Sequence, residues 1–64
     1  MDDKAKINWA RKLKPGDVID SCNGTNKVIR EVYNQEDDNP YNIEVEFTDS
    51  TSCMVMYCCE PSRK

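Results

Sequence analysis

Residues 42–47, with the sequence Asn-Ile-Glu-Val-Glu-Phe, form the stretch that decides the fold. Apolar Ile43, Val45 and Phe47 alternate with two glutamates, which is the period of a β-strand that buries one face. Such a strand sends every second side chain to the same side of a sheet. We therefore expect Ile43, Val45 and Phe47 to point together into the hydrophobic core.

Two segments after this strand complete a predicted hairpin. The polar residues Thr48–Thr51 favour a turn, and Ser52–Tyr57 is a second run rich in residues that suit a pleated surface. The sequence therefore predicts a β-hairpin over Asn42–Tyr57. A short fifth strand or a 3₁₀ turn fits Cys58–Pro61, because a proline cannot donate to a strand ladder and ends the folded part.

Two earlier segments also predict strands. They are Asp17–Cys22 and Asn26–Tyr33, joined by Asn23-Gly24, a pair typical of tight hairpin turns. Apolar residues of the longer segment fall on both faces, so we expect this strand to be central and strongly bent. Asn34–Tyr41 is a predicted loop. Its acidic run, Glu36–Asn39, lacks the spaced ligands of a calcium loop and is interpreted as a solvated tip.

The N-terminal segment Asp2–Leu13 is the predicted helix. Asp2 or Asp3 can cap its start, where negative charge is favourable. The helix must end before Pro15, because a residue that precedes proline is pushed towards extended geometry. Trp9 lies on the apolar side, and we expect its indole to cover an open end of the sheet.

The chain of 64 residues is expected to form one domain with a small core. We divide it into a helical segment at 1–13, a β-barrel at 14–60 and a tail at 61–64. Its start is polar, and no stretch approaches the roughly 20 apolar residues of a membrane-spanning helix. These features predict a cytoplasmic protein that does not enter the membrane.

Three segments resemble a small SH3-like barrel of the KOW or Tudor type. They are Leu13–Ile19 with its Pro-Gly-Asp, Val28–Val32, and Ile43–Asp49. The resemblance covers about residues 13–58 and implies a mainly β fold of four to five antiparallel strands with a short N-terminal helix. The KOW glycine between the second and third strands and an aromatic cage are both missing. Ribosome or polymerase binding and methyl-lysine recognition are therefore not carried over.

A second, narrower pattern is similar to small tailed-phage proteins without an assigned activity. It consists of Trp9-Ala10, Leu13–Asp17, Ser52-Cys53 and a late Cys58-Cys59-x-Pro61. This resemblance implies a phage-encoded accessory protein that acts in the cytoplasm of a bacterial host.

The net charge of −3 is unevenly distributed along the chain. Residues 1–16 carry five basic and two acidic residues, whereas residues 17–62 carry ten acidic and only two basic ones. An acidic body repels nucleic-acid phosphate, because duplex affinity depends largely on cations. Nucleic-acid binding through the basic N-terminal segment is the alternative function, and the solvated face of a helix is the simpler interpretation.

The sequence favours a non-enzymatic protein that binds a host or viral protein. Candidate contact residues are exposed aromatic, basic and methionine side chains: Trp9, Arg11, Lys12, Met54 and Met56. The two methionines share one face of Ser52–Tyr57 if that run is extended, and methionine suits adaptable contacts. Burial of both faces under the N-terminal helix is an equal alternative.

The cysteines are the one candidate for a chemical site. A zinc-stabilised module would use Cys22, Cys53, Cys58 and Cys59, but their spacing contains no paired C-x₂-C knuckle. A five-stranded barrel would bring Cys22 near Cys53 or Cys58, because its first and last strands are neighbours. Free, mostly buried thiols nevertheless fit better than zinc or than a structural disulfide, which conflicts with a cytoplasmic protein, so we expect no metal and no cofactor. The sequence has no histidine to serve as a general base, and catalysis is not predicted.

Overall fold

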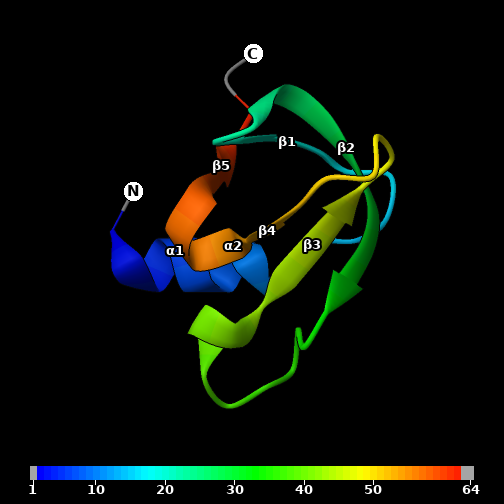
Figure 1. Cartoon of the computed structure of the whole chain (residues 1–64). Helices are drawn as coiled ribbons and strands as arrows, with labels where there is room; N and C mark the ends of the chain where they lie inside the picture. The colour runs from blue at the N-terminus through cyan, green and yellow to red at the C-terminus, as the bar shows by residue number, and fades with distance from the viewer. Residues whose placement is uncertain (1, 63–64) are drawn as a thin grey trace.

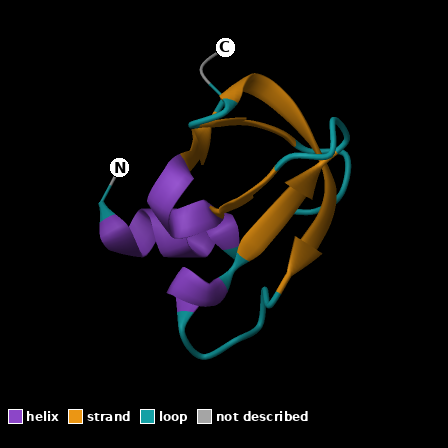
Figure 2. Cartoon of the chain, viewed as in Figure 1, coloured by secondary structure: helices purple, strands orange, loops and turns teal. Residues whose placement is uncertain are grey.

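The computed structural model describes residues 2–62, which form one antiparallel sheet with helical segments gathered at one end (Figures 1 and 2). The mainly β prediction with a short N-terminal helix is therefore confirmed. In chain order the elements are α1 (Asp3–Ala10), β1 (Val18–Ser21), β2 (Gly24–Tyr33), the 3₁₀ helix η1 (Pro40–Asn42), β3 (Glu44–Phe47), β4 (Ser52–Met54), α2 (Val55–Cys58) and β5 (Cys59–Pro61).

The five strands lie in the order β4-β3-β2-β1-β5. The ten-residue β2 is central, because its first half pairs with β1 and its second half pairs with β3. The register shifts once in each ladder, and β2 curves across the sheet in Figure 1. The expected central, bent strand is confirmed. Within the described residues the sheet is open, with β4 and β5 as its two edges.

The predicted inward face of β3 is correct. Ile43, Val45 and Phe47 are fully buried, whereas the two glutamates between them are partly exposed. The turn that follows is closed by two backbone bonds, from Phe47 N to the Thr51 carbonyl at 2.8 Å and from Ser50 N to the Phe47 carbonyl at 3.0 Å. The alternation over residues 43–47 is therefore enough to predict which face of β3 is buried.

The predicted fourth strand, Ser52–Tyr57, is wrong in its second half. β4 ends at Met54, and the chain turns into α2. The Val55 amide donates to the Ile43 carbonyl at 3.0 Å, which holds the helical turn against the start of β3. A helical turn places Val55 and Met56 in the core together, whereas a strand would send them to opposite faces.

The N-terminal helix is shorter than the predicted Asp2–Leu13. Asp2 is its N-cap, and the carboxylate accepts from the Ala5 amide at 2.8 Å, as expected of a capping aspartate. The helix ends at Ala10, and the chain then continues in a tighter turn in which Lys12 N donates to the Trp9 carbonyl at 3.1 Å. The last predicted turn is therefore not α-helical.

Two boundaries near the chain reversals also differ from the prediction. Ser21 pairs with Gly24, so the first hairpin turn consists of Cys22-Asn23 instead of Asn23-Gly24. The predicted tail at residues 61–64 starts too early, because Pro61 lies in β5 opposite Ile19. An edge strand tolerates this proline, since one side of its backbone has no partner strand. The rest of the predicted tail, Arg63 and Lys64, lies outside the described residues.

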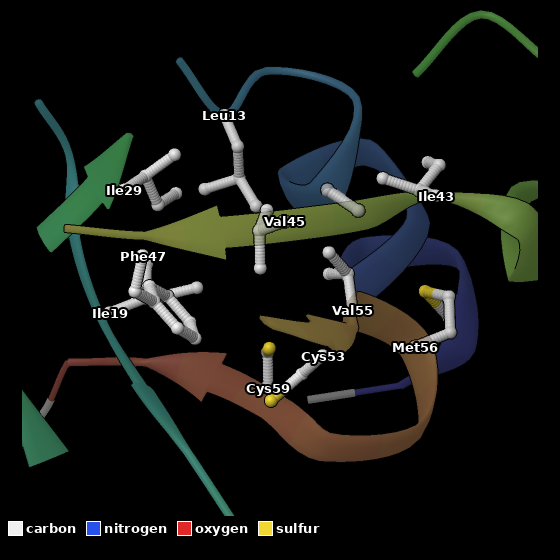
Figure 3. Packing of buried hydrophobic residues seen from close by; sticks show 11 residues of the cluster. Leu13, Ile19, Ile29, Ile43, Val45, Phe47, Cys53, Val55, Met56 and Cys59 are labelled. Carbon is white, nitrogen blue, oxygen red and sulfur yellow. The ribbon is translucent and has the colours of Figure 1, made fainter. Parts of the chain in front are cut away.

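The core lies between the curved sheet and the helical segments (Figure 3). Trp9 packs against it and remains half-buried, in keeping with its predicted covering role. Every strand and both α-helices contribute side chains to the core, and so do Leu13 and Ile43 from the connecting segments, so the core links elements from both ends of the chain. The buried residues are Ala10, Leu13, Ile19, Ile29, Ile43, Val45, Phe47, Cys53, Val55, Met56 and Cys59.

Candidate partner-binding surface

A pair of tyrosines, one exposed and one partly buried, lies where two helical segments meet. Tyr57 of α2 is 69% exposed, and Tyr41 of η1 lies beside it with ring centroids 5.4 Å apart and planes tilted by 56°. Tilted aromatic pairs at this spacing attract each other through their quadrupoles. The pair therefore forms an ordered aromatic surface at the end of the sheet that carries α2 and η1.

The backbone beneath Tyr57 is held by the core and by Lys6. The preceding residues Val55 and Met56 are buried in the core. The ammonium group of Lys6, from α1, donates to the Met56 carbonyl at 3.3 Å and lies 3.7 Å from the Glu60 carboxylate. Because α2 is held in this way, its exposed tyrosine sits on a fixed support and loses little freedom when it binds.

The loop before Tyr41 is acidic and is ordered by its own side chains. The Asp37 carboxylate accepts from the Asn39 amide at 2.8 Å and from the Asn42 side chain at 3.3 Å. Asn39 in turn accepts from the Tyr41 amide at 3.0 Å and caps η1. These bonds order the loop, and its exposed acidic residues Glu36–Asp38 stand shortly before Tyr41 in the sequence.

The residues predicted to contact a partner do not form one surface. Trp9 is half-buried against the core, and Arg11 donates to the Gln35 carbonyl at 2.8 Å. Met54 is partly buried, and Met56 is only 8% exposed, so of the two alternatives the structure favours burial over an outward methionine face. Of the five candidates, Lys12 alone is exposed. The helical turn α2 explains why the methionines do not form an exposed face, because it directs Met56 towards the core and Tyr57 towards solvent.

Three of the five N-terminal cations are already engaged within the molecule. Lys6 and Arg11 hold the carbonyl groups described above, and the ammonium group of Lys14 lies 3.1 Å from the Asp17 carboxylate. Lys4 and Lys12 are exposed. This arrangement leaves a weak basic patch for phosphate, because each neutralised phosphate requires a cation of its own.

The four cysteines come together from three parts of the chain. Cys22 lies in the first hairpin turn, Cys53 in β4, Cys58 at the end of α2 and Cys59 at the start of β5. The Cys53 thiol interacts with the other three, and its sulfur also accepts from the Asn23 side chain at 3.3 Å. Figure 3 shows the Cys53 and Cys59 sulfurs near each other in the core.

These surroundings disfavour thiolate formation at three of the cysteines. Burial raises the pKa of Cys53, and burial followed by repulsion from Cys53 raises the pKa of Cys59 to about 12. The hydrogen bond with Cys22 is the first cause that raises the pKa of Cys58. A nucleophilic cysteine needs a lowered pKa, so these three thiols are not activated for catalysis. All four cysteines are free.

Sequence reasoning missed the exposure of Tyr57 and anticipated only part of the convergence of the thiols. Period-2 alternation put Tyr57 on the same face as Val55 and left open which face is inward, whereas the helical turn, held by the bond from Val55 to Ile43, buries Val55 and exposes Tyr57. Within residues 2–62, no group of three or more His, Cys, Asp or Glu side chains is arranged to hold a metal ion, and no helix is long and apolar enough to cross a membrane.

No protein-family model, curated protein or solved structure matches the chain.

Proposed function

We propose that this protein is a non-enzymatic binding module that engages a host or viral protein through Tyr57 and Tyr41. The observation that carries the proposal is the 69% exposure of Tyr57 on a turn whose neighbours are buried. Large aromatic side chains on a rigid support are typical anchors of protein interfaces, because they bury much area at little entropic cost.

The acidic residues that stand close to the two tyrosines in the sequence point to the chemistry of the partner segment. The acidic residues Glu36–Asp38 are exposed before Tyr41, and Glu60 follows Tyr57 closely in the chain. A basic side chain, arginine above all, gains from the carboxylates and from the face of a tyrosine ring at the same time. The proposed occupant is therefore an exposed polypeptide segment that carries arginine or lysine beside apolar residues.

The proposal includes an SH3-like barrel as the scaffold of the module. The strand order β4-β3-β2-β1-β5 and the single helical turn between β4 and β5 support it. The thiol contact between Cys53 of β4 and Cys59 of β5 also supports it, because it brings the two edges of the sheet towards each other. With the tailed-phage resemblance, the proposed site of action is the cytoplasm of a bacterial host.

Nucleic-acid binding is the less favoured function. The internal engagement of Lys6, Arg11 and Lys14 leaves few cations for a phosphate backbone. Residues 17–62 add a strongly acidic body. Binding to duplex DNA would therefore be weak and would fall steeply as salt is added.

A matched pair of tyrosine variants tests the binding surface. Tyr57→Ala removes the proposed anchor, and Tyr33→Ala removes a tyrosine that is 45% exposed on β2 and bonded to Glu46. Immobilised wild type and variants are incubated with nuclease-treated bacterial lysate, and captured proteins are identified and re-tested as purified partners. We expect Tyr57→Ala to lower the affinity for a purified partner at least tenfold and Tyr33→Ala to leave it unchanged.

Two controls make this experiment decisive. Both variants must keep the urea midpoint of the wild type, because both side chains are exposed and contribute little to the core. Titration with a short DNA duplex at low and high salt measures the alternative function. Equal affinity of both variants for the partner would contradict the proposed surface, and duplex binding tighter than partner binding would contradict the proposed function.

A further inference from the structure

Two cysteines far apart in sequence, Cys22 in the first hairpin turn and Cys58 at the end of α2, lie one step beyond the end of the β1–β5 ladder. Ser21 is paired with Cys59 in the antiparallel ladder, so the next residue along each segment is Cys22 on one side and Cys58 on the other. The Cys22 amide donates to the Cys58 carbonyl at 3.1 Å, which extends the pairing by one step. The two backbones are therefore aligned at this position.

This alignment matches the requirements of a disulfide. Opposite residues of an antiparallel pair have Cα atoms about 4.5–5.5 Å apart, and disulfides span Cα separations of about 4.4–6.8 Å. Cys22 is also the first cause that raises the pKa of the Cys58 thiol, as expected of side chains that lie close together. A bond between Cys22 and Cys58 requires rotation of side chains and little movement of the backbone.

Cys22 and Cys58 are the more exposed two of the four cysteines. Cys22 is exposed and Cys58 is half-buried, whereas Cys53 and Cys59 belong to the buried core. The rate of thiol–disulfide exchange depends on how easily a disulfide reagent reaches the attacking thiol, as well as on the reactivity of that thiol. Cys22 is therefore the cysteine that a disulfide reagent in solution reaches first.

We propose that Cys22 and Cys58 are a modification site that closes into an intramolecular disulfide by exchange with a small disulfide such as glutathione disulfide. The Cys22 thiolate attacks one sulfur of the reagent, forms a mixed disulfide and releases one glutathione thiolate. The Cys58 thiolate then attacks the Cys22 sulfur, forms the Cys22–Cys58 bond and releases the second glutathione. The two cysteines lose two electrons and two protons, and glutathione disulfide gains them as two glutathione molecules.

The experiment exposes the folded, reduced full-length chain to buffers of fixed glutathione and glutathione disulfide ratios. Free thiols are capped with one alkylating reagent, disulfides are reduced, and the released thiols are capped with a second reagent of different mass. Fragmentation of the tryptic peptides then reads the label at each cysteine, including the adjacent Cys58 and Cys59. We expect the second label at Cys22 and Cys58 only, on a chain that stays monomeric.

Two variants check the assignment. Cys22→Ser, at an exposed position, should prevent the cross-link while the protein stays folded. Cys58→Ser should leave Cys22 as a mixed disulfide with glutathione, which a mass increase of one glutathione per chain detects. The proposal is overturned if the wild type accumulates only glutathione adducts or dimers, if it does not react, or if the second label appears at Cys53 or Cys59. These readouts do not depend on the tyrosine surface, so this proposal and the proposed function fail separately.

Discussion

Phe47 is the largest fully buried side chain in the described part of the chain. It is fully buried, pairs with Ile29 across the β2–β3 ladder, and has the Lys27 ammonium group 5.5 Å from its ring centroid. Truncation to alanine removes the ring and leaves a cavity. We therefore expect Phe47→Ala to lower the free energy of unfolding by about 3–5 kcal/mol, measured by urea denaturation.

The control for this truncation is Val28→Ala on the exposed surface of β2. Val28 is 38% exposed, so its truncation should change the free energy of unfolding by about 0.5 kcal/mol or less. A cooperative transition with unchanged stability after Phe47→Ala would mean that the inward face of β3 contributes nothing, contrary to its burial.

Asp49 makes folding sensitive to acid. The Lys27 ammonium group donates to its carboxylate, and the hydroxyl and the amide of Thr51 donate to it as well, so the pKa of Asp49 is held well below its usual range. A carboxyl whose pKa is lower in the folded chain stabilises the fold above its unfolded pKa of about 3.9, and this contribution is lost as the pH falls below that value.

We therefore expect the thermal midpoint of the wild type to fall between pH 5 and pH 2 by more than that of Asp49→Asn, which cannot titrate at this position. At neutral pH the variant should be less stable, because the amide replaces an ion pair with Lys27. Parallel pH profiles of the two proteins over this range would show that the carboxylate contributes no acid sensitivity. The exposure of the group keeps the expected effect small.

Gln35 acts at the scale of an element, because it closes the C-terminal end of α1. Its amide nitrogen donates to the carbonyls of Ala10 at 2.9 Å and Leu13 at 2.7 Å. Gln35→Glu keeps the shape but replaces the donor with a negative charge, which is unfavourable at a helix C-terminus. We expect a loss of about 1–3 kcal/mol in the free energy of unfolding, measured by urea denaturation.

The neighbouring Glu36 supplies a matched control for this charge change. Glu36 is exposed, so Glu36→Gln should leave the urea midpoint close to that of the wild type. Faster hydrogen exchange in α1 of Gln35→Glu, together with the lower midpoint, would assign the loss to the helix end. A midpoint equal to that of the Glu36 variant would contradict the role of the Gln35 amide.

The elements show which parts of this fold the sequence predicts and which it does not. The face of β3 follows from strict alternation, which only a strand produces over Ile43, Val45 and Phe47. The run Ser52–Tyr57 is apolar at almost every position and is compatible with a strand or a helix. A single long-range bond from Val55 to Ile43 decides between them. The exposed Tyr57 was for this reason beyond prediction from local pattern.

The thiol cluster depends on the whole molecule. Cys53 and Cys59 lie on the two edge strands of the sheet, which are its most distant members in strand order. The curvature of the sheet, centred on β2, brings these edges towards each other. The sequence supports the expectation that first and last strands are neighbours, and β1 and β5 do pair. Apolar residues on both faces of Asn26–Tyr33 predict the bend of β2, but they do not show how close this bend brings Cys53 to Cys59.

The same arrangement leads to a prediction about metal. A zinc site needs deprotonated thiolates at about 2.3 Å from one point. Cys59 instead faces the apolar core, and burial raises its pKa to about 12, so its ionisation is strongly opposed. We expect elemental analysis of the purified protein to find well under one zinc per chain. We also expect a chelator to leave the urea midpoint unchanged, because buried apolar side chains, and not a metal, hold the sheet to the helices. Cys59→Ala offers the control: if the thiol only fills space, the variant loses stability equally with and without the chelator. One zinc per chain, with unfolding on chelation, would contradict this prediction and would make the cysteine cluster the structural centre of the protein.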